Sequence, residues 1–135
     1  SSKADFNIIV TSIQLLAWEH GFETWGNYPK EVDRLKQLLV QTQAKRAIIL
    51  SGDRHISEFS KTEIDGLNHP LWDFTSSGLT HSYEEFKGEP NQYRVGEVVF
   101  LPSYGVVQLN FTNFKASFKI MGENGRILQE VVQSY

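Results

Sequence analysis

Two short apolar segments, separated by a helical pattern, constrain the fold of this chain more than any other feature. Phe6–Ile13 is rich in β-branched residues, and Ala47–Ser51 is a second apolar run of strand length. Between them a helix is expected from Pro29, a residue that suits the first turn, to about Gln43. Its apolar positions recur at helical spacing: Val32, Leu35, Leu38 and Leu39. The order strand, helix, strand predicts a βαβ unit with parallel strands and a right-handed crossover.

The middle of the chain has no comparable pattern. We expect residues 60–95 to be mainly loops, because glycine and proline interrupt them repeatedly. The interrupting residues are Gly66, Pro70, Gly78, Gly88 and Pro90. Trp72 and Phe74 are expected to enter the core from such a loop.

From Val98 onward the pattern predicts three or four strands. Apolar residues alternate at Val107, Leu109 and Phe111, and again at Ala116, Phe118 and Ile120. Asn124-Gly125 is a strong hairpin signal, with Ile127–Val132 as the returning strand. The predicted fold class is therefore α/β, with one βαβ unit followed by antiparallel strands and a C-terminal hairpin. Because one such unit supplies only two parallel strands, we expect part of a larger sheet to lie elsewhere.

Composition excludes several classes of function. The chain has 135 residues, the length of a single domain. Its 13 basic and 16 acidic residues give a net charge of −3, so no nucleic-acid binding is expected. It has no cysteine, which excludes disulfides, thiolate metal sites and cysteine nucleophiles within it. No apolar run has the length of a membrane span.

The densest polar cluster, Ser51–Glu58, follows the second apolar strand directly. Ligands of α/β sheets bind beyond the carboxyl ends of the strands, where this cluster falls. On an extended chain, Asp53 and His55 would leave the same side and reach one metal ion or two adjacent ones. Gly52 would let the backbone turn tightly, and Glu58 would orient the imidazole by accepting its second N–H.

The same residues also have a purely structural interpretation. Gly-Asp after a strand is a common turn, Asp53 would cap a following helical turn, and His55 would be a half-buried side chain. Two ligands also do not complete a catalytic metal site, which usually takes at least three from the protein. Spacing alone leaves both interpretations open.

Several segments together carry a resemblance to a known family. Ile49–Glu58 (ILSGDRHISE) is followed by Pro70–Thr80 (PLWDFTSSGLT), and Trp25–Pro29 (WGNYP) precedes the leucine-rich helix. Ser12–Gln14 (SIQ) and Tyr93–Gly96 (YRVG) extend the match in the same order. In these segments the chain resembles the alkaline phosphatase D family of the calcineurin-like metallophosphoesterase superfamily.

The resemblance covers most of residues 5–111 and implies a metal-dependent phosphoric ester hydrolase, an alkaline phosphatase or phosphodiesterase. In that superfamily a pair of metals binds phosphate oxygens and activates water for in-line attack on phosphorus. The resemblance implies that Asp53 and His55 are metal ligands, and that His81 lies at the pocket rim, where it would contact the phosphoryl or leaving group. Calcium, iron, manganese and zinc all suit this ligation. Arg54 would point away from its neighbours and is expected to be a structural ion-pair residue.

One departure from the family is large. The superfamily's early Asp-rich and Asn-His-Asp type elements would precede Asp5, and the sequence does not contain them. The resemblance therefore implies that residues 1–135 are a single domain, the C-terminal portion of a metallophosphoesterase catalytic domain, and are not catalytically competent alone. A phosphate ester is the expected substrate, and self-association or pairing with the missing N-terminal part is expected. Family members are often exported, which implies a periplasmic or extracellular setting.

An alternative from a different class is a non-catalytic β-rich binding or structural module. It would contact a partner or a glycan surface through Trp18, Trp25 and Tyr28. His20 and His69 are isolated in polar segments, and both are expected to be exposed.

Overall fold

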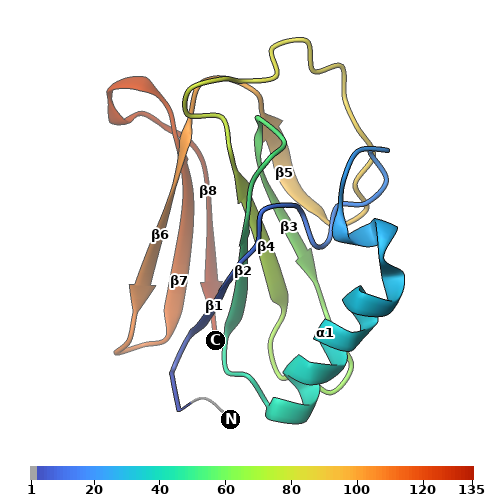
Figure 1. The fold of residues 1–135 in the computed structure, drawn as a ribbon. Coiled ribbons are helices and arrows are strands. Elements are labelled where there is room, and N and C mark those ends of the chain that lie inside the picture. The colour runs from blue at the N-terminus through green and yellow to red at the C-terminus, as the bar shows by residue number, and fades with distance from the viewer. Residues whose placement is uncertain (1–2) are drawn as a thin grey trace.

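The computed structural model of the protein describes residues 3–135, which form two β-sheets and the helix α1 (Pro29–Thr42) (Figure 1). The strands are β1 (Asn7–Val10), β2 (Ala47–Ser51), β3 (Ser57–Thr62), β4 (Leu71–Ser76), β5 (Arg94–Val99), β6 (Tyr104–Asn110), β7 (Lys115–Met121) and β8 (Ile127–Ser134). Two short 3-10 turns are η1 (Trp25–Asn27) and η2 (Glu123–Gly125). The five-stranded sheet has the order β1-β2-β4-β3-β5, and the three-stranded sheet has the order β6-β7-β8. Helix α1 covers one face of the five-stranded sheet, and the three-stranded sheet covers the other (Figure 1).

The first half of the chain forms the predicted βαβ unit. β1 and β2 are parallel, with Asn7 opposite Ala47, and β2 has the bounds predicted for it. Helix α1 begins at Pro29 and ends at Thr42, where Gln43 takes a left-handed conformation that satisfies carbonyls of the last turn. β1 is shorter than the predicted strand, and β2 pairs with β4, also in parallel, on its other side.

The expectation that residues 60–95 are mainly loops is wrong. β3 and β4 form an antiparallel pair in the sheet, with Glu58 opposite Thr75, and β3 also pairs with β5. Nine of the twelve residues of these two strands are buried, on both faces of the sheet, and several of the buried residues are polar. The apolar and polar alternation of a half-exposed strand is therefore absent from this part of the sequence.

Two apolar clusters lie on the two faces of the five-stranded sheet. Between the sheets lie Phe6, Ile48, Phe59, Trp72, Phe74, Ala116, Phe118 and Ile120. Under α1 and the loop before it lie Leu15, Leu16, Leu39, Ala47, Ile49 and Leu71. Trp72 and Phe74 are core residues as expected, but they lie on β4 rather than on a loop.

The C-terminal strands follow the predicted alternation with one exception. Ala116, Phe118 and Ile120 are fully buried against the five-stranded sheet. The turn between β7 and β8 contains Asn124 and Gly125, both with positive φ, as the hairpin signal predicts. Phe111 is the exception, because it lies beyond the end of β6 and is 59% exposed.

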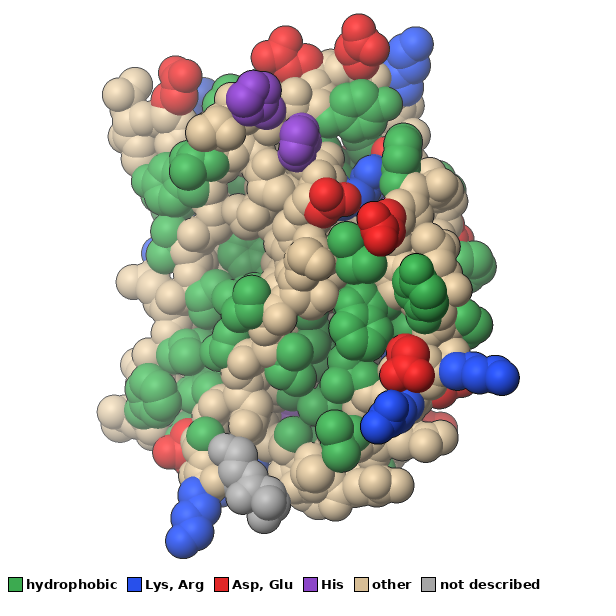
Figure 2. Space-filling model, in the orientation of Figure 1, with side chains coloured by type: hydrophobic (Ala, Val, Ile, Leu, Met, Phe, Trp, Pro, Cys, Tyr) green, Lys and Arg blue, Asp and Glu red, His purple; other side chains and the backbone are tan. Residues whose placement is uncertain are grey.

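The two sheets are joined on one side and leave an open groove on the other. Next to β5, the side-chain amide of Gln129 donates to the carbonyl of Glu97 (3.0 Å) and accepts from its N–H (2.7 Å). On the opposite side β1 and β6 are edge strands, and a groove of about 390 Å³ lies between them. Val10, which lines the groove, is 76% exposed. Hydrophobic side chains gather over the middle of the face shown in Figure 2.

None of the helices formed by residues 3–135 has the length and apolar character needed to cross a membrane.

Candidate functional site

The turn that carries the predicted metal ligands joins β2 to β3 at the carboxyl end of β2 (Figure 1). The backbones of Asp53 and His55 are both left-handed there, with φ of 70° and 54°. The N–H of Arg54 donates to the carbonyl of Gly52 (2.9 Å), which closes a three-residue turn centred on Asp53. The segment is therefore not extended, so the expectation that Asp53 and His55 leave the same side of an extended chain does not apply to it. Gly52, which was expected to allow the tight turn, does not have a left-handed backbone. The left-handed positions of the turn are Asp53 and His55.

Arg54 lies between the two predicted ligands and is buried, with its side chain 5% exposed. Its Nη2 atom donates to the carboxylate of Glu89, and its guanidinium lies 4.4 Å from the ring centroid of Phe22. These contacts agree with the expected structural ion pair. They join the turn to the loop before α1 and to the loop after β4.

The side chains of Asp53 and His55 are exposed and free for a ligand. Within the described residues, neither takes part in a hydrogen bond or ion pair. The imidazole of His55 lies beside that of His81, an exposed residue of the loop after β4, with ring centroids 6.3 Å apart. Histidine side chains lie near one another at the upper end of the face in Figure 2. The structure thus brings His55 and His81 side by side.

The donor chemistry at this rim suits a divalent cation, but the set is incomplete. A carboxylate oxygen and imidazole nitrogens are ligands for borderline and hard metals. Among residues 3–135, no three His, Cys, Asp or Glu side chains converge as a metal site requires. The side-chain types of Asp53 and His55 suit a metal ion, and a complete catalytic site would need at least one further protein ligand.

Glu58, expected to orient the imidazole of His55, does something else. It lies on β3 and is 2% exposed. Its Oε1 accepts from the side-chain amide of Gln14 (2.7 Å), and its Oε2 accepts from Nε of Arg94 (2.8 Å). The expectation is wrong because Glu58 is buried on β3 and both of its carboxylate oxygens accept hydrogen bonds from Gln14 and Arg94.

A buried polar network beneath the turn was not predicted from the sequence. The carboxylate of Asp73, on β4, accepts the N–H groups of Leu15 (2.8 Å) and Leu16 (3.0 Å) and the hydroxyl of Ser51 (2.6 Å). Burial raises the pKa of Asp73, and the hydrogen bonds from Ser51 and from the two backbone N–H groups partly offset that rise. The one signal in the sequence was an acidic residue between Trp72 and Phe74 in an apolar segment.

Gln14 extends this network across the sheet. Its side-chain amide donates both to Glu58 and to the hydroxyl of Thr75 (2.8 Å), which lies 2.9 Å from the hydroxyl of Ser51. Because Ser51 is the last residue of β2, the network fixes the point from which the turn at Gly52 departs.

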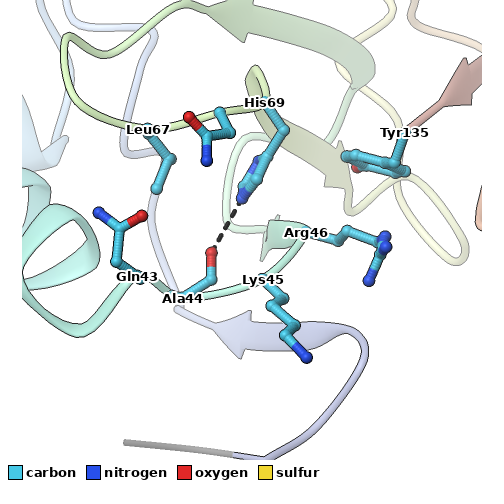
Figure 3. A pocket seen from close by; sticks show the side chains of 8 residues that line it. Gln43, Ala44, Lys45, Arg46, Leu67, His69 and Tyr135 are labelled. Atoms are coloured by element: carbon cyan, nitrogen blue, oxygen red, sulfur yellow. Dashed lines mark hydrogen bonds between the residues drawn. The ribbon is translucent and has the colours of Figure 1, made fainter.

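The expectation that His20 and His69 are exposed is wrong, because both are half-buried. Nδ1 of His20 accepts the N–H of Phe22 (3.1 Å). Burial and the charge of Arg54 lower the pKa of His20, against smaller opposing effects that include the carboxylates of Glu89 and Glu58. Nε2 of His69 lies 2.9 Å from the carbonyl oxygen of Ala44 (Figure 3).

His69 lines a cavity of about 300 Å³ (Figure 3). The cavity is formed mainly by residues that precede β2 and β4, at the opposite end of β2 from the turn at Gly52. Basic and amide side chains surround the cavity, and some of their donors are engaged within the protein, whereas Nε of Arg46 has no partner among the described residues. Gln43 donates to the carbonyls of Val40 and Gly66, and Arg46 donates to the carbonyl of Asp5. The guanidinium of Arg46 also lies 3.7 Å from the ring centroid of Phe114.

The three aromatic residues of the binding-module hypothesis lie in different settings. Trp25 packs against the cluster under α1, and its indole N–H donates to the hydroxyl of Thr11 (2.9 Å). Trp18 and Tyr28 are exposed, and Trp18 lines a cavity of about 250 Å³ beside α1.

Comparison with known proteins yields a match at the level of the fold. The sequence matches no family model, and no curated protein is similar to it. The structure is similar to a solved structure described as "Structure of PhoD", with a TM-score of 0.68 and 15% sequence identity. The match covers 99% of this chain and 29% of that chain, so the chain spans less than a third of the length of PhoD. As its resemblance to the alkaline phosphatase D family predicted, the chain has the fold of a portion of PhoD.

Proposed function

We propose that this chain is part of a metal-dependent phosphoric ester hydrolase and supplies Asp53 and His55 as metal ligands. The observation that carries the proposal is the position of these two side chains. They lie at the carboxyl end of β2 in a PhoD-like fold, exposed to solvent, and neither side chain has a hydrogen-bond or ion-pair partner among the described residues. The family resemblance supplies the same two residues from the sequence alone.

Each residue of the site would have a distinct task. The Asp53 carboxylate and the His55 imidazole would bind a divalent cation, for which calcium, manganese, iron and zinc are all suitable. A bound metal pair would supply charge stabilisation for phosphate oxygens and a nucleophile at neutral pH. His81, whose ring lies 6.3 Å from that of His55, would contact a phosphoryl oxygen or the leaving group.

We further propose that residues 1–135 are the C-terminal portion of a longer catalytic domain. The chain spans 29% of PhoD, and its β1 edge is apolar and unpaired within residues 3–135. A parallel strand is usually covered on both sides, so a segment of the longer protein would pair with β1 and fill the groove beside Val10. That segment would also supply the remaining metal ligands, and this chain alone would be inactive. By the same resemblance, the setting would be periplasmic or extracellular.

The experiment is hydrolysis of a chromogenic phosphate ester by the longer protein that contains this chain. The double variant Asp53→Ala with His55→Ala should lose at least about 100-fold in rate, because each substitution removes a ligand. Asp65→Ala, at an exposed carboxylate on the loop before β4, is the matched control and should keep full activity. Unchanged hydrolysis by the double variant would reject the proposal.

The binding-module hypothesis makes a different prediction. It is supported by the exposed side chain of Trp18 beside its cavity. Under it, Trp18→Ala would weaken capture of a partner without any dependence on metal, and the double variant at Asp53 and His55 would bind normally.

A further inference from the structure

The turn between β2 and β3 holds two non-glycine residues in a left-handed conformation, with one buried arginine between them. Such a backbone is uncommon outside glycine, although Asp and His adopt it more often than most residues. Asp53 is in addition the central residue of a three-residue turn, a rare and strained arrangement. A conformation of this kind persists only where surrounding contacts enforce it.

We propose that Arg54 is a positioning residue, whose buried ion pair with Glu89 holds Asp53 and His55 in the backbone conformation that presents both side chains to one cation. The proposal rests on the proposed function as far as the cation is concerned. The claim that the ion pair holds the turn depends only on the backbone conformation and contacts of the turn.

Three contacts from outside the turn hold it in place. Arg54 pairs with Glu89, which lies 35 residues away on the loop after β4, and its guanidinium packs on the ring of Phe22 from the loop before α1. The carbonyl of His55 accepts the N–H of Tyr83 (2.9 Å). Glu89 and Tyr83 lie on the loop after β4, and Phe22 lies on the loop before α1. Both loops are distant in sequence from the turn, so the turn is determined by tertiary structure rather than by local preference.

Because Arg54 is buried, we infer that it positions the turn rather than binding a ligand itself. Its side chain is 5% exposed, whereas the residues on either side are exposed to solvent. The guanidinium is instead engaged by Glu89 and packs on the ring of Phe22. Among the described residues Glu89 accepts the one hydrogen bond of this side chain, and Nε of Arg54 has no partner. Arg54 therefore acts on the site through the backbone.

Loss of the ion pair would release the turn. With Arg54 no longer held, Asp53 and His55 would relax toward negative φ, which changes the direction of both Cα–Cβ bonds. Two ligands that share one cation would separate, while β2 and β3 would keep their pairing partners β4 and β5. The effect expected is a loss of cation affinity in a chain that is still folded.

The first test needs no metal and compares Asp53→Gly with Asp53→Ala. Both remove the carboxylate, but only alanine has a Cβ that opposes a left-handed backbone. In the otherwise unchanged chain, the glycine variant should melt about 4 °C higher than the alanine variant. With Arg54→Met and Glu89→Gln also present, the two should melt together. Methionine at position 54 keeps an apolar side chain against Phe22. Because glutamine at position 89 is neutral, the two substitutions together leave no unpaired buried charge. An equal difference in both backgrounds would overturn the role of the ion pair.

The second test uses the longer protein that contains this chain and follows the turn and the cation in the same samples. NMR shifts and φ-sensitive couplings should show left-handed Asp53 and His55 in the unchanged chain and their loss in the Arg54→Met, Glu89→Gln chain. Mn²⁺ affinity should fall about tenfold or more in that chain, and Arg54→Lys, which keeps a charge for Glu89, should restore part of it. Arg34→Met, at an exposed arginine of α1, is the control and should change neither readout.

The outcomes distinguish the two proposals. A turn that relaxes in a chain that never bound Mn²⁺ would reject the metal ligation and keep the positioning role. A turn that keeps its left-handed residues, or an affinity that is unchanged, would overturn the positioning role.

Discussion

The hydroxyl of Ser51 donates a 2.6 Å hydrogen bond to the fully buried carboxylate of Asp73. Ser51 is the last residue of β2, and the candidate ligand turn begins at the next residue. Asp73 also accepts two backbone N–H groups, those of Leu15 and Leu16, so one carboxylate joins β2, β4 and the loop before α1. A polar network of this kind is stabilising only when it is satisfied, because a lost partner leaves a buried polar group unpaired.

The first prediction concerns the pH dependence contributed by Asp73. Burial raises its pKa above the ordinary 3.8, so the folded chain holds this proton more tightly than the unfolded chain. The contribution to stability is greatest below 3.8 and is lost as pH rises through the folded pKa. Asp73→Asn keeps an acceptor for the two N–H groups and removes the titration. Between pH 4 and 7, its free energy of unfolding in urea should fall less with rising pH than that of the unchanged chain.

The control for that measurement is Asp65→Asn, at an exposed carboxylate. Its free energy of unfolding, plotted against pH, should run parallel to that of the unchanged chain. Parallel curves for Asp73→Asn as well would show that Asp73 does not titrate differently in the folded state.

A second prediction has the opposite sign and concerns His20. Burial, and then Arg54, lower its pKa below the ordinary 6.5, so the unfolded chain binds this proton more readily. The stability that neutral His20 contributes is present above pH 6.5 and is lost as pH falls through the folded pKa. His20→Gln should therefore lose less thermal stability than the unchanged chain when the pH is lowered from 8 to 5. His81→Gln, at an exposed histidine, should behave like the unchanged chain, and an equal acid response of the His20 variant would contradict the burial argument.

A third prediction tests the close contact between Gly26 and Trp18. A Cβ on Gly26 would lie 2.2 Å from Cβ of Trp18, which cannot move without its backbone. Gly26→Ala should lower the free energy of unfolding by about 1–3 kcal/mol. At Gly52 the nearest atoms would lie at 3.6 Å and 3.7 Å, so Gly52→Ala should be nearly neutral in the same urea titration. An unchanged free energy of unfolding for Gly26→Ala would mean that the loop before α1 can move to accommodate the added methyl group.

A fourth prediction concerns the packing of the two sheets. Phe118 of β7 is fully buried, and its ring lies 5.4 Å from that of Trp72 and 6.0 Å from that of Phe74. Phe118→Ala should cost about 3–5 kcal/mol in unfolding free energy. Val132→Ala, at an exposed position of the neighbouring strand, should cost less than about 0.5 kcal/mol. Similar costs for the two would argue against a shared core between the sheets.

Local periodicity was sufficient to predict the βαβ unit and the last hairpin. The bounds of β2 and the start of α1 follow from apolar spacing and from Pro29, and the hairpin follows from Asn124-Gly125. These features depend on residues close together in the sequence.

Features that depend on distant partners were not predictable in this way. β3 and β4 contain buried polar residues such as Glu58, whose partner Arg94 is 36 positions away. The same limit applies to the site. The family resemblance selected Asp53 and His55 as ligands, whereas spacing alone left a structural role open. Their left-handed backbone, which accompanies the contact between Arg54 and Glu89, 35 positions apart, was not predictable from either.

The most direct measurement of the central claim is paramagnetic broadening of NMR signals by Mn²⁺ in the longer protein that contains this chain, where the remaining proposed ligands are present. Signals of Asp53, His55 and the neighbouring His81 should broaden first, and the pattern should disappear in the Asp53→Ala, His55→Ala chain. Broadening centred on another acidic part of the surface, or no localised broadening at millimolar Mn²⁺, would contradict the assignment of these two residues as metal ligands.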